Sequence, residues 1–346
     1  MRKQLLHLMN YEFYMGVDMS KLTFDYCLID DQGTILKPGQ VKNNPSSIKS
    51  WTKELSHEFG IDFWSDLLLC LEHSGYYAAP LLKTLHQTVE TSIWLESALQ
   101  IKRSIGLQRG KSDRTDAVRI AVYCLDFQRK ARLWRPSSRS MERLNLMLSH
   151  RDRMVKYKMA METTVKEEKG FVAEDLHEEM LGLNAGPIEA LQKEILEIDQ
   201  RIEELLRSDE ELRRLEIIIK SMPGFGPVIA PKIIAVTEGF TRLTDPRAFA
   251  CYSGVAPFEH RSGTSLKGKT RVSHLANKDM KKMLHLAALV TIRKGNIMHE
   301  YFNRKVAQGK NKMSVINAIR NKLIHILFAC IRNNVTYQKN YHHSLA

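Results

Sequence analysis

The sequence predicts an α/β domain at the N-terminus, then a helical middle region with a coiled-coil pattern, and then a mostly helical C-terminal domain. The first part of this prediction comes from short apolar runs separated by turn residues, up to about residue 100. The second comes from a heptad pattern that ends near residue 205, and the third from long apolar segments after residue 279. We expect the chain to divide into residues 1–135, 136–215 and 216–346.

In the first domain, the predicted strands and helices follow a definite order. A tight turn at residues 31–33 joins two of the strands, and Asn44-Pro45-Ser46 is typical of a helix start. Residues 67–72 are apolar up to a final glutamate, which predicts a buried strand. The expected strands are residues 14–18, 23–30, 34–42, 67–72 and 91–95, and the expected helices run from about 46 to 59, from about 78, and from 99 to about 133. Three antiparallel strands, then helix, strand, helix and strand, is the order of the ribonuclease H-like fold.

The middle region carries a regular apolar stripe with spacings of three and four residues, which is the a/d pattern of a coiled coil. The stripe consists of Ile188, Leu191, Ile195, Ile198, Ile202 and Leu205. Residues 141–161 lack Pro and Gly, so they predict a second helix. The simplest arrangement is an antiparallel hairpin broken at residues 182–187. The pattern leaves open whether the stripe pairs within one chain or between two.

A Pro-Gly-Phe-Gly-Pro segment at residues 223–227 separates two apolar helical segments. This pattern is typical of a helix-hairpin-helix motif, in which Gly224 and Gly226 would let the backbone approach a phosphate. The alternative is an ordinary corner between two helices of the core. After residue 279 the chain is expected to be helical to about residue 333.

The formal net charge of +13 indicates a polyanionic partner, for which nucleic acid is a better candidate than a membrane surface. No run of about eighteen apolar residues is present, so no membrane span is expected. The five cysteines are scattered singly, which is typical of reduced thiols in the cytoplasm. A bacterial, nucleoid-associated location would agree with a nucleic-acid partner.

The basic residues are concentrated in two stretches. Residues 102–156 hold fifteen Lys and Arg against five acids, and residues 261–282 hold seven against one. Between them, residues 162–211 hold sixteen acids against five bases. The alternation suggests a polymer gripped at two places. In the first stretch, the candidates for nucleic-acid contact are Lys111, Arg114, Arg129, Lys130, Arg132 and Arg135.

Four carboxylates are candidate ligands of Mg²⁺. Asp18 and Glu72 end two predicted strands, and buried acids must be paired or bind a cation. Asp113 and Asp116 lie three residues apart near a helix start, so they share one face. Four converging acids would form a two-metal site for phosphodiester chemistry. The alternatives are that Asp113 caps the helix and that Asp116 pairs with Arg114 or Arg119.

These motifs together resemble the DEDD-type transposases of bacterial insertion sequences of the 110/1111 group. The motifs of the first half are Gly-Val-Asp-x-Ser-Lys at residues 16–21, Glu-x-Ser-Gly-Tyr at 72–76 and Lys-Ser-Asp-x-x-Asp-Ala at 111–117. Those of the second half are Pro-Gly-x-Gly at 223–226, Gly-Val-x-Pro at 254–257 and Ser-Gly at 262–263, the last followed by Lys and Arg. The resemblance covers nearly the whole chain and implies a RuvC-like first domain.

The resemblance also implies a mechanism. Relatives are recombinases guided by a structured RNA that pairs with donor and target DNA, and they act as dimers and tetramers. Carried over to this chain, the Mg²⁺ ligands are Asp18, Glu72, Asp113 and Asp116, and Ser262 attacks DNA to form a phosphoserine link. Many relatives have a serine where this chain has Arg261, which leaves Ser265 as a rival nucleophile. The cations expected to neutralise the phosphate are Arg261, Lys267, Lys269 and Arg271.

Three other functions remain open from the sequence. A RuvC-like junction nuclease or resolvase would use the same acids with water as the attacking group. A sugar-kinase or actin-like ATPase also begins with Gly-Val-Asp, but its second glycine-rich phosphate loop is not found. A non-catalytic nucleic-acid-binding protein would use the acids only for stability, and it would not respond to divalent metal.

Overall fold

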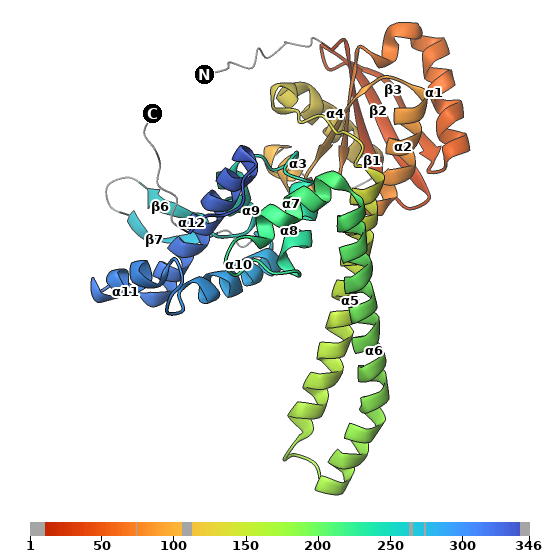
Figure 1. Ribbon diagram of the computed structural model, residues 1–346. Helices are drawn as coiled ribbons and strands as arrows, with labels where there is room; N and C mark the ends of the chain where they lie inside the picture. Colours follow the sequence, from red (N-terminus) through yellow and green to blue (C-terminus); the bar gives the residue numbers. More distant parts are fainter. Residues whose placement is uncertain (1–10, 74, 106–112, 263–265, 273–274, 340–346) are drawn as a thin grey trace. The chain divides into compact units, whose positions relative to one another are not determined.

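The computed structural model describes residues 11–73, 75–105, 113–262, 266–272 and 275–339. For residues 105, 113–114, 258–262 and 266–271 it describes the backbone alone. The chain separates into two compact units, residues 1–136 and 137–346. Figure 1 shows the five-stranded sheet of the first unit and the helices of the second.

The first unit is built on a mixed five-stranded sheet in the order β3-β2-β1-β4-β5. β1, β2 and β3 are antiparallel neighbours, whereas β4 and β5 run parallel to β1. The strands are β1 (Phe13–Met19), β2 (Thr23–Asp30), β3 (Ile35–Lys42), β4 (Leu67–Glu72) and β5 (Ser92–Glu96). This is the ribonuclease H-like arrangement that the element order predicted.

Helices cover both faces of the sheet. α1 (Pro45–Phe59) and α2 (Ala79–Thr88) lie on one face, and α4 (Asp113–Phe127) lies on the other (Figure 1). Asn44 caps α1 by accepting a hydrogen bond from the Ser47 backbone N–H at 2.9 Å, as its sequence predicted. The remaining helical segments are η1 (Ile61–Trp64), η2 (Gly75–Ala78), α3 (Ala98–Ile105) and η3 (Gln128–Lys130).

The strands of this sheet place alternate side chains in two separate cores. Met15 and Val17 of β1 pack with α1 and α2, whereas Tyr14 packs with α4. In β4, Leu69 belongs to the first core and Cys70 to the second. Even-numbered residues of β1 and β4 therefore face α4, and this alternation decides where the acids at the strand ends lie.

The second unit begins with a long antiparallel helical hairpin, α5 (Arg139–Glu168) and α6 (Glu174–Ser208). The predicted stripe lies on the inner side of α6, where Ile195, Ile198 and Ile202 are buried against α5. Arg151 of α5 pairs with Asp199 of α6 across the same hairpin. The stripe therefore pairs within one chain.

The predicted break at residues 182–187 is wrong. These residues continue α6, with Pro187 inside the helix, and the turn lies at residues 169–173 instead. Gly170 in that turn has a φ of 85°, a left-handed conformation that glycine adopts without strain. The cost of Pro187 is tolerated because the residues that precede it are mostly exposed and the buried stripe continues beyond it.

The rest of the second unit is a helical bundle with one β-hairpin. Its core joins the base of the α5–α6 hairpin to the C-terminal helices. The elements are α7 (Glu210–Lys220), α8 (Ile229–Thr237), α9 (Pro246–Tyr252), β6 (Pro257–Ser262), β7 (Leu266–Val272), α10 (Lys278–Thr291), α11 (His299–Ala307) and α12 (Lys312–Asn333). The helices after residue 279 were expected from the sequence, but β6 and β7 were not.

One helix of the described chain, α12, is long and apolar enough to cross a membrane by length and hydropathy alone. Half of its apolar window is buried in the structure, and most of its buried side chains belong to the core of the second unit. This is the environment expected of a helix at the centre of a protein core.

Candidate active site

The acids at the strand ends form a row across the sheet. Asp18 of β1 pairs with Asp25 of β2, and Glu72 of β4 pairs with Glu96 of β5. The β1–β4 ladder is in register up to the residues just before Asp18 and Glu72, so these two acids are neighbours across adjacent strands. The predicted proximity of Asp18 and Glu72 is therefore present in the backbone register.

The acid row lies on the face of the sheet that α4 covers. Asp18 follows Tyr14 and Gly16 at alternate positions, and Glu72 follows Cys70, whose side chain packs with α4. Both Asp18 and Glu72 are half-buried. A half-buried row of carboxylates under a helix provides oxygen donors at a place that solvent still reaches.

Gly16 holds α4 against β1 beside this row. A Cβ atom at Gly16 would lie 2.1 Å from the Ala121 backbone nitrogen and 2.2 Å from the Ala117 carbonyl oxygen. Only a residue without a side chain permits this approach. Gly16 precedes Asp18 by two residues, and Ala117 directly follows Asp116, so this contact sets the separation between the strand and the helix that carry the acids.

The two helical acids differ in what the structure describes. Asp113 is the first residue of α4, and its side chain lies outside the described ones, as does that of Arg114. Asp116 accepts a hydrogen bond from Arg119 at 2.7 Å and forms an ion pair with it. Pairing with Arg119 was one of the two alternatives for Asp116.

The donor chemistry of the site suits a hard divalent cation. Carboxylate oxygens are the protein ligands that Mg²⁺ prefers, and the two acids of β1 and β4 are adjacent. Among the described side chains, no group of three or more His, Cys, Asp or Glu is gathered closely enough to hold a metal. Arg119 forms an ion pair with Asp116, one of the expected ligands, so it competes with a metal ion for that carboxylate.

Glu96 is an acid of this row that the sequence analysis missed. Its carboxylate accepts a hydrogen bond from the Tyr123 hydroxyl of α4 at 3.3 Å. Burial and the nearby Glu96 carboxylate raise the pKa of Tyr123, so the phenol remains a protonated donor. The signal was present in the sequence, because Glu96 follows an apolar strand just as Glu72 does.

The candidate nucleophile belongs to the other unit. Ser262 is the last residue of β6 and pairs with Leu266 at the start of β7, so it stands at the turn end of a two-stranded hairpin. Arg261 pairs with Lys267, and Lys269 and Arg271 follow along β7. Ser265 lies outside the described residues.

Two family models of transposases match different parts of the chain. A family model for the DEDD transposases of IS110 matches residues 15–166, and one described as "Transposase IS116/IS110/IS902 family" matches residues 217–303. The chain belongs to the IS110 family of transposases.

This transposase has relatives that match nearly its whole length. It is 25% identical to the pilin gene-inverting protein of Moraxella lacunata over 335 residues, which cover 95% of this chain and 98% of the relative. It is 30% identical over 154 residues to the insertion element IS900 uncharacterized 42 kDa protein of Mycobacterium paratuberculosis, covering 44% of this chain and 37% of that one. T. thermophilus RuvC in complex with a Holliday junction substrate aligns with 36% of this chain and 100% of its own, with a TM-score of 0.29 and 12% identity.

The first basic stretch of the transposase is exposed to solvent at the end of the first unit. Arg129, Arg132 and Arg135 are exposed, and within the described residues no ion pair involves them. Lys130 lies 4.7 Å from the centre of the Phe127 ring. Lys111 lies outside the described residues. Arg135 also lines a surface hollow of about 590 Å³. The exposed arginines of this stretch are therefore accessible to a polyanion.

The glycine turn of the transposase joins α7 to α8 and has a packing role. Gly224 has a φ of 84°, and a Cβ atom there would lie 2.6 Å from the Ala287 carbonyl oxygen of α10. This contact matches the alternative of a corner in the core. Gly226 has no atom within 4 Å of its Cβ position, so a phosphate approach at this turn remains a prediction for Gly226.

Proposed function

We propose that this transposase cuts and rejoins DNA through a covalent bond to Ser262, with Mg²⁺ held by Asp18, Glu72, Asp113 and Asp116. The observation that carries the proposal is the backbone contact at Gly16, which brings the Asp18–Glu72 row under the helix that bears the other two acids. Bound Mg²⁺ would neutralise charge on the scissile phosphate and orient it.

The serine step conserves the number of phosphodiester bonds. The Ser262 oxygen attacks phosphorus, one strand end leaves as a hydroxyl carrying the proton that the serine loses, and a phosphoserine link to DNA remains. Attack by a hydroxyl of the partner strand on that link restores the serine and joins the strands in a new order. No external energy source is required.

The position of Ser262 supports this role. It is the last residue of β6, four residues before Leu266 at the start of β7. Lys267 and Lys269 lie on β7, and cations there would stabilise charge on the phosphate. The name of the Moraxella relative describes gene inversion, and inversion requires rejoining as well as cutting. A nuclease that uses water would not rejoin.

The proposal includes DNA as donor and target, a structured guide RNA and a homo-oligomer. The net charge of +13 and the exposed arginines before residue 136 support a nucleic-acid partner. To test the guide RNA, the RNA that purifies with the transposase is sequenced and then removed with ribonuclease. Strand exchange that survives complete RNA removal would contradict it.

Mass photometry with and without DNA tests the dimer and the tetramer.

The alternative is a RuvC-like junction nuclease that shares the acid row and uses water. Ser262→Ala separates the two, because it should lower strand cleavage by about 10⁴-fold or more in the serine mechanism. Ser265→Ala is the matched control and should retain activity. A Ser262→Ala variant that still cuts at the wild-type rate would assign the chain to the water-using class.

A further inference from the structure

Arg320 of α12 is a buried cation with no acidic partner among the described residues. It is 5% exposed, and its one recorded hydrogen-bond contact joins Nη2 to Nδ1 of His285 in α10 at 3.1 Å. Its Nε atom is buried without a hydrogen-bond partner in the described structure. The proposed reaction leaves this group without a role.

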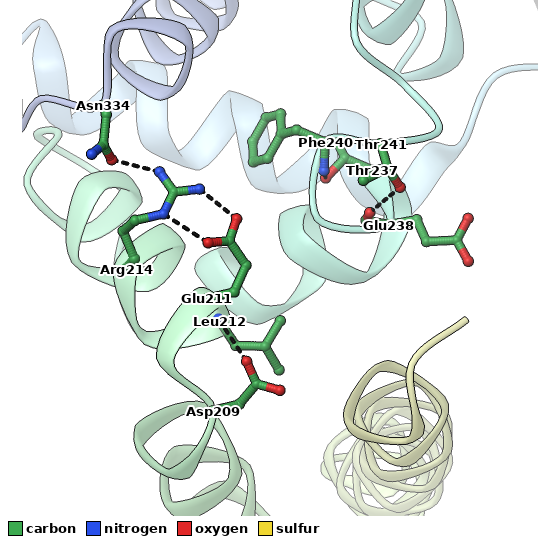
Figure 2. Close-up of polar contacts among 9 residues, drawn as sticks. All are labelled: Asp209, Glu211, Leu212, Arg214, Thr237, Glu238, Phe240, Thr241 and Asn334. Carbon is green, nitrogen blue, oxygen red and sulfur yellow. Dashed lines mark hydrogen bonds and ion pairs between the residues drawn. The ribbon is translucent and has the colours of Figure 1, made fainter. Parts of the chain in front are cut away.

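Arg214, in the same unit, shows how an arginine is normally satisfied. Its guanidinium donates to both carboxylate oxygens of Glu211, with Nε to Oε2 at 2.9 Å, and Nη1 donates to Asn334 (Figure 2). The hydrogen bonds to Glu211 raise the pKa of Arg214, whereas burial lowers the pKa of Arg320. The two arginines therefore differ in the anion that one has and the other lacks.

A histidine does not replace the missing anion. Burial and the neighbouring Arg320 lower the pKa of His285, so its ring is neutral near pH 7 and offers Nδ1 as an acceptor. The guanidinium stays charged in proteins, so its burial without an anion disfavours the folded state. His285 is only half-buried, which leaves an approach from solvent beside it.

The site lies at the base of the β6–β7 hairpin. Asn317, one turn before Arg320, donates a hydrogen bond from its amide to the Val255 carbonyl at 2.9 Å. Lys281, one turn before His285, lies against Gly254. The next residues of the chain enter β6, which ends at Ser262. The ligand of Arg320 would therefore be held beside the segment that presents the nucleophile.

We propose that Arg320, with His285 beside it, binds a phosphate group of the DNA strand on which the transposase acts. The chemical class follows from the donor: a guanidinium whose Nε has no hydrogen-bond partner in the described structure matches the oxygens of a phosphodiester. This inference rests on the proposed function for the identity of the strand. The anion site itself does not depend on the serine mechanism.

Arg320→Met in the full-length protein tests the site without measuring catalysis. Because methionine removes an uncompensated buried charge, the melting temperature without ligand should stay level or rise by about 2–4 °C. Inorganic phosphate should raise the melting temperature of the wild type but not of the variant. The salt dependence of duplex DNA binding, as the slope of log K against log salt, should fall by about one.

Arg320→Lys and Arg214→Met are the controls. Arg320→Lys keeps the charge and should keep the salt slope, whereas Arg214→Met removes a satisfied arginine and should leave both the phosphate response and the slope unchanged. Ser262→Ala should also retain both, which separates this site from the serine mechanism. A wild-type salt slope and phosphate response in Arg320→Met would overturn the proposal. It would also be overturned if the substitution lowered the salt slope for single-stranded RNA but not for duplex DNA.

Discussion

Replacing Gly16 by alanine should separate the strand that carries Asp18 from the helix that carries Asp116. The added Cβ atom would meet backbone atoms of α4 at 2.1–2.2 Å, whereas ordinary van der Waals contact begins near 3.4 Å. Backbone atoms cannot rotate away as a flexible side chain does, so α4 must retreat by more than an ångström. Such overpacking typically lowers stability by about 1–3 kcal/mol.

The larger effect is expected on catalysis. A misplacement of about 1 Å at a reacting centre can reduce the rate by roughly 100-fold. Gly16→Ala should therefore reduce strand cleavage by about two orders of magnitude under conditions where the variant remains folded. Cleavage of a labelled donor DNA, measured below the melting temperature of the variant, gives this ratio.

Gly182→Ala is the matched control, because no atom lies within 4 Å of its Cβ position in α6 and it does not directly precede Pro187. It should retain activity and gain up to about 1 kcal/mol of stability, since alanine favours a helix over glycine. A folded Gly16→Ala variant that cleaves DNA as fast as the wild type would refute the close-approach argument.

Three further changes test other parts of the account. Arg119→Met removes the cation paired with an expected metal ligand, so Mg²⁺ affinity by calorimetry should rise up to about five-fold, and a fall would count against competition. Arg132→Gln with Arg135→Gln should lower the salt slope of nucleic-acid binding by about two, and an unchanged slope would make these residues a merely solvated face. Ile202→Asp buries a charge in the core and should lower the free energy of unfolding by about 3–5 kcal/mol. Leu196→Asp, at an exposed position of the same helix, should change the free energy of unfolding little. Equal effects of the two substitutions would contradict the hairpin packing.

The sequence predicted the sheet of the first unit well because its strands are bounded by clear signals. Residues 23–30 and 67–72 form strands with the predicted limits, since turn residues follow the first and a continuous apolar run defines the second. The fifth strand was predicted one residue short at its C-terminal end. This small error left Glu96 outside the predicted acid row.

Elements stabilised by tertiary contacts were harder to predict. Residues 182–187 contain Gly and Pro, which favoured a break. In the structure α6 continues through them, because the buried stripe after Pro187 packs against α5 and stabilises the helix. Gly170 was the better signal for the turn. The β6–β7 hairpin carries many charges and little alternation of apolar residues, so its strands were missed. The same hairpin positions Ser262, which the family resemblance rather than the local pattern identified.

The most direct test of the account is the covalent link at Ser262. A suicide substrate with a nick beside the cleavage site lets the cut fragment diffuse away, so the protein–DNA intermediate accumulates. Proteolysis and mass spectrometry then locate the modified residue in the peptide around residues 261–267. The account predicts a phosphodiester-linked nucleotide on Ser262 that requires Mg²⁺ and intact Asp18. Cleavage without any protein–DNA adduct, or an adduct on Ser265, would contradict it.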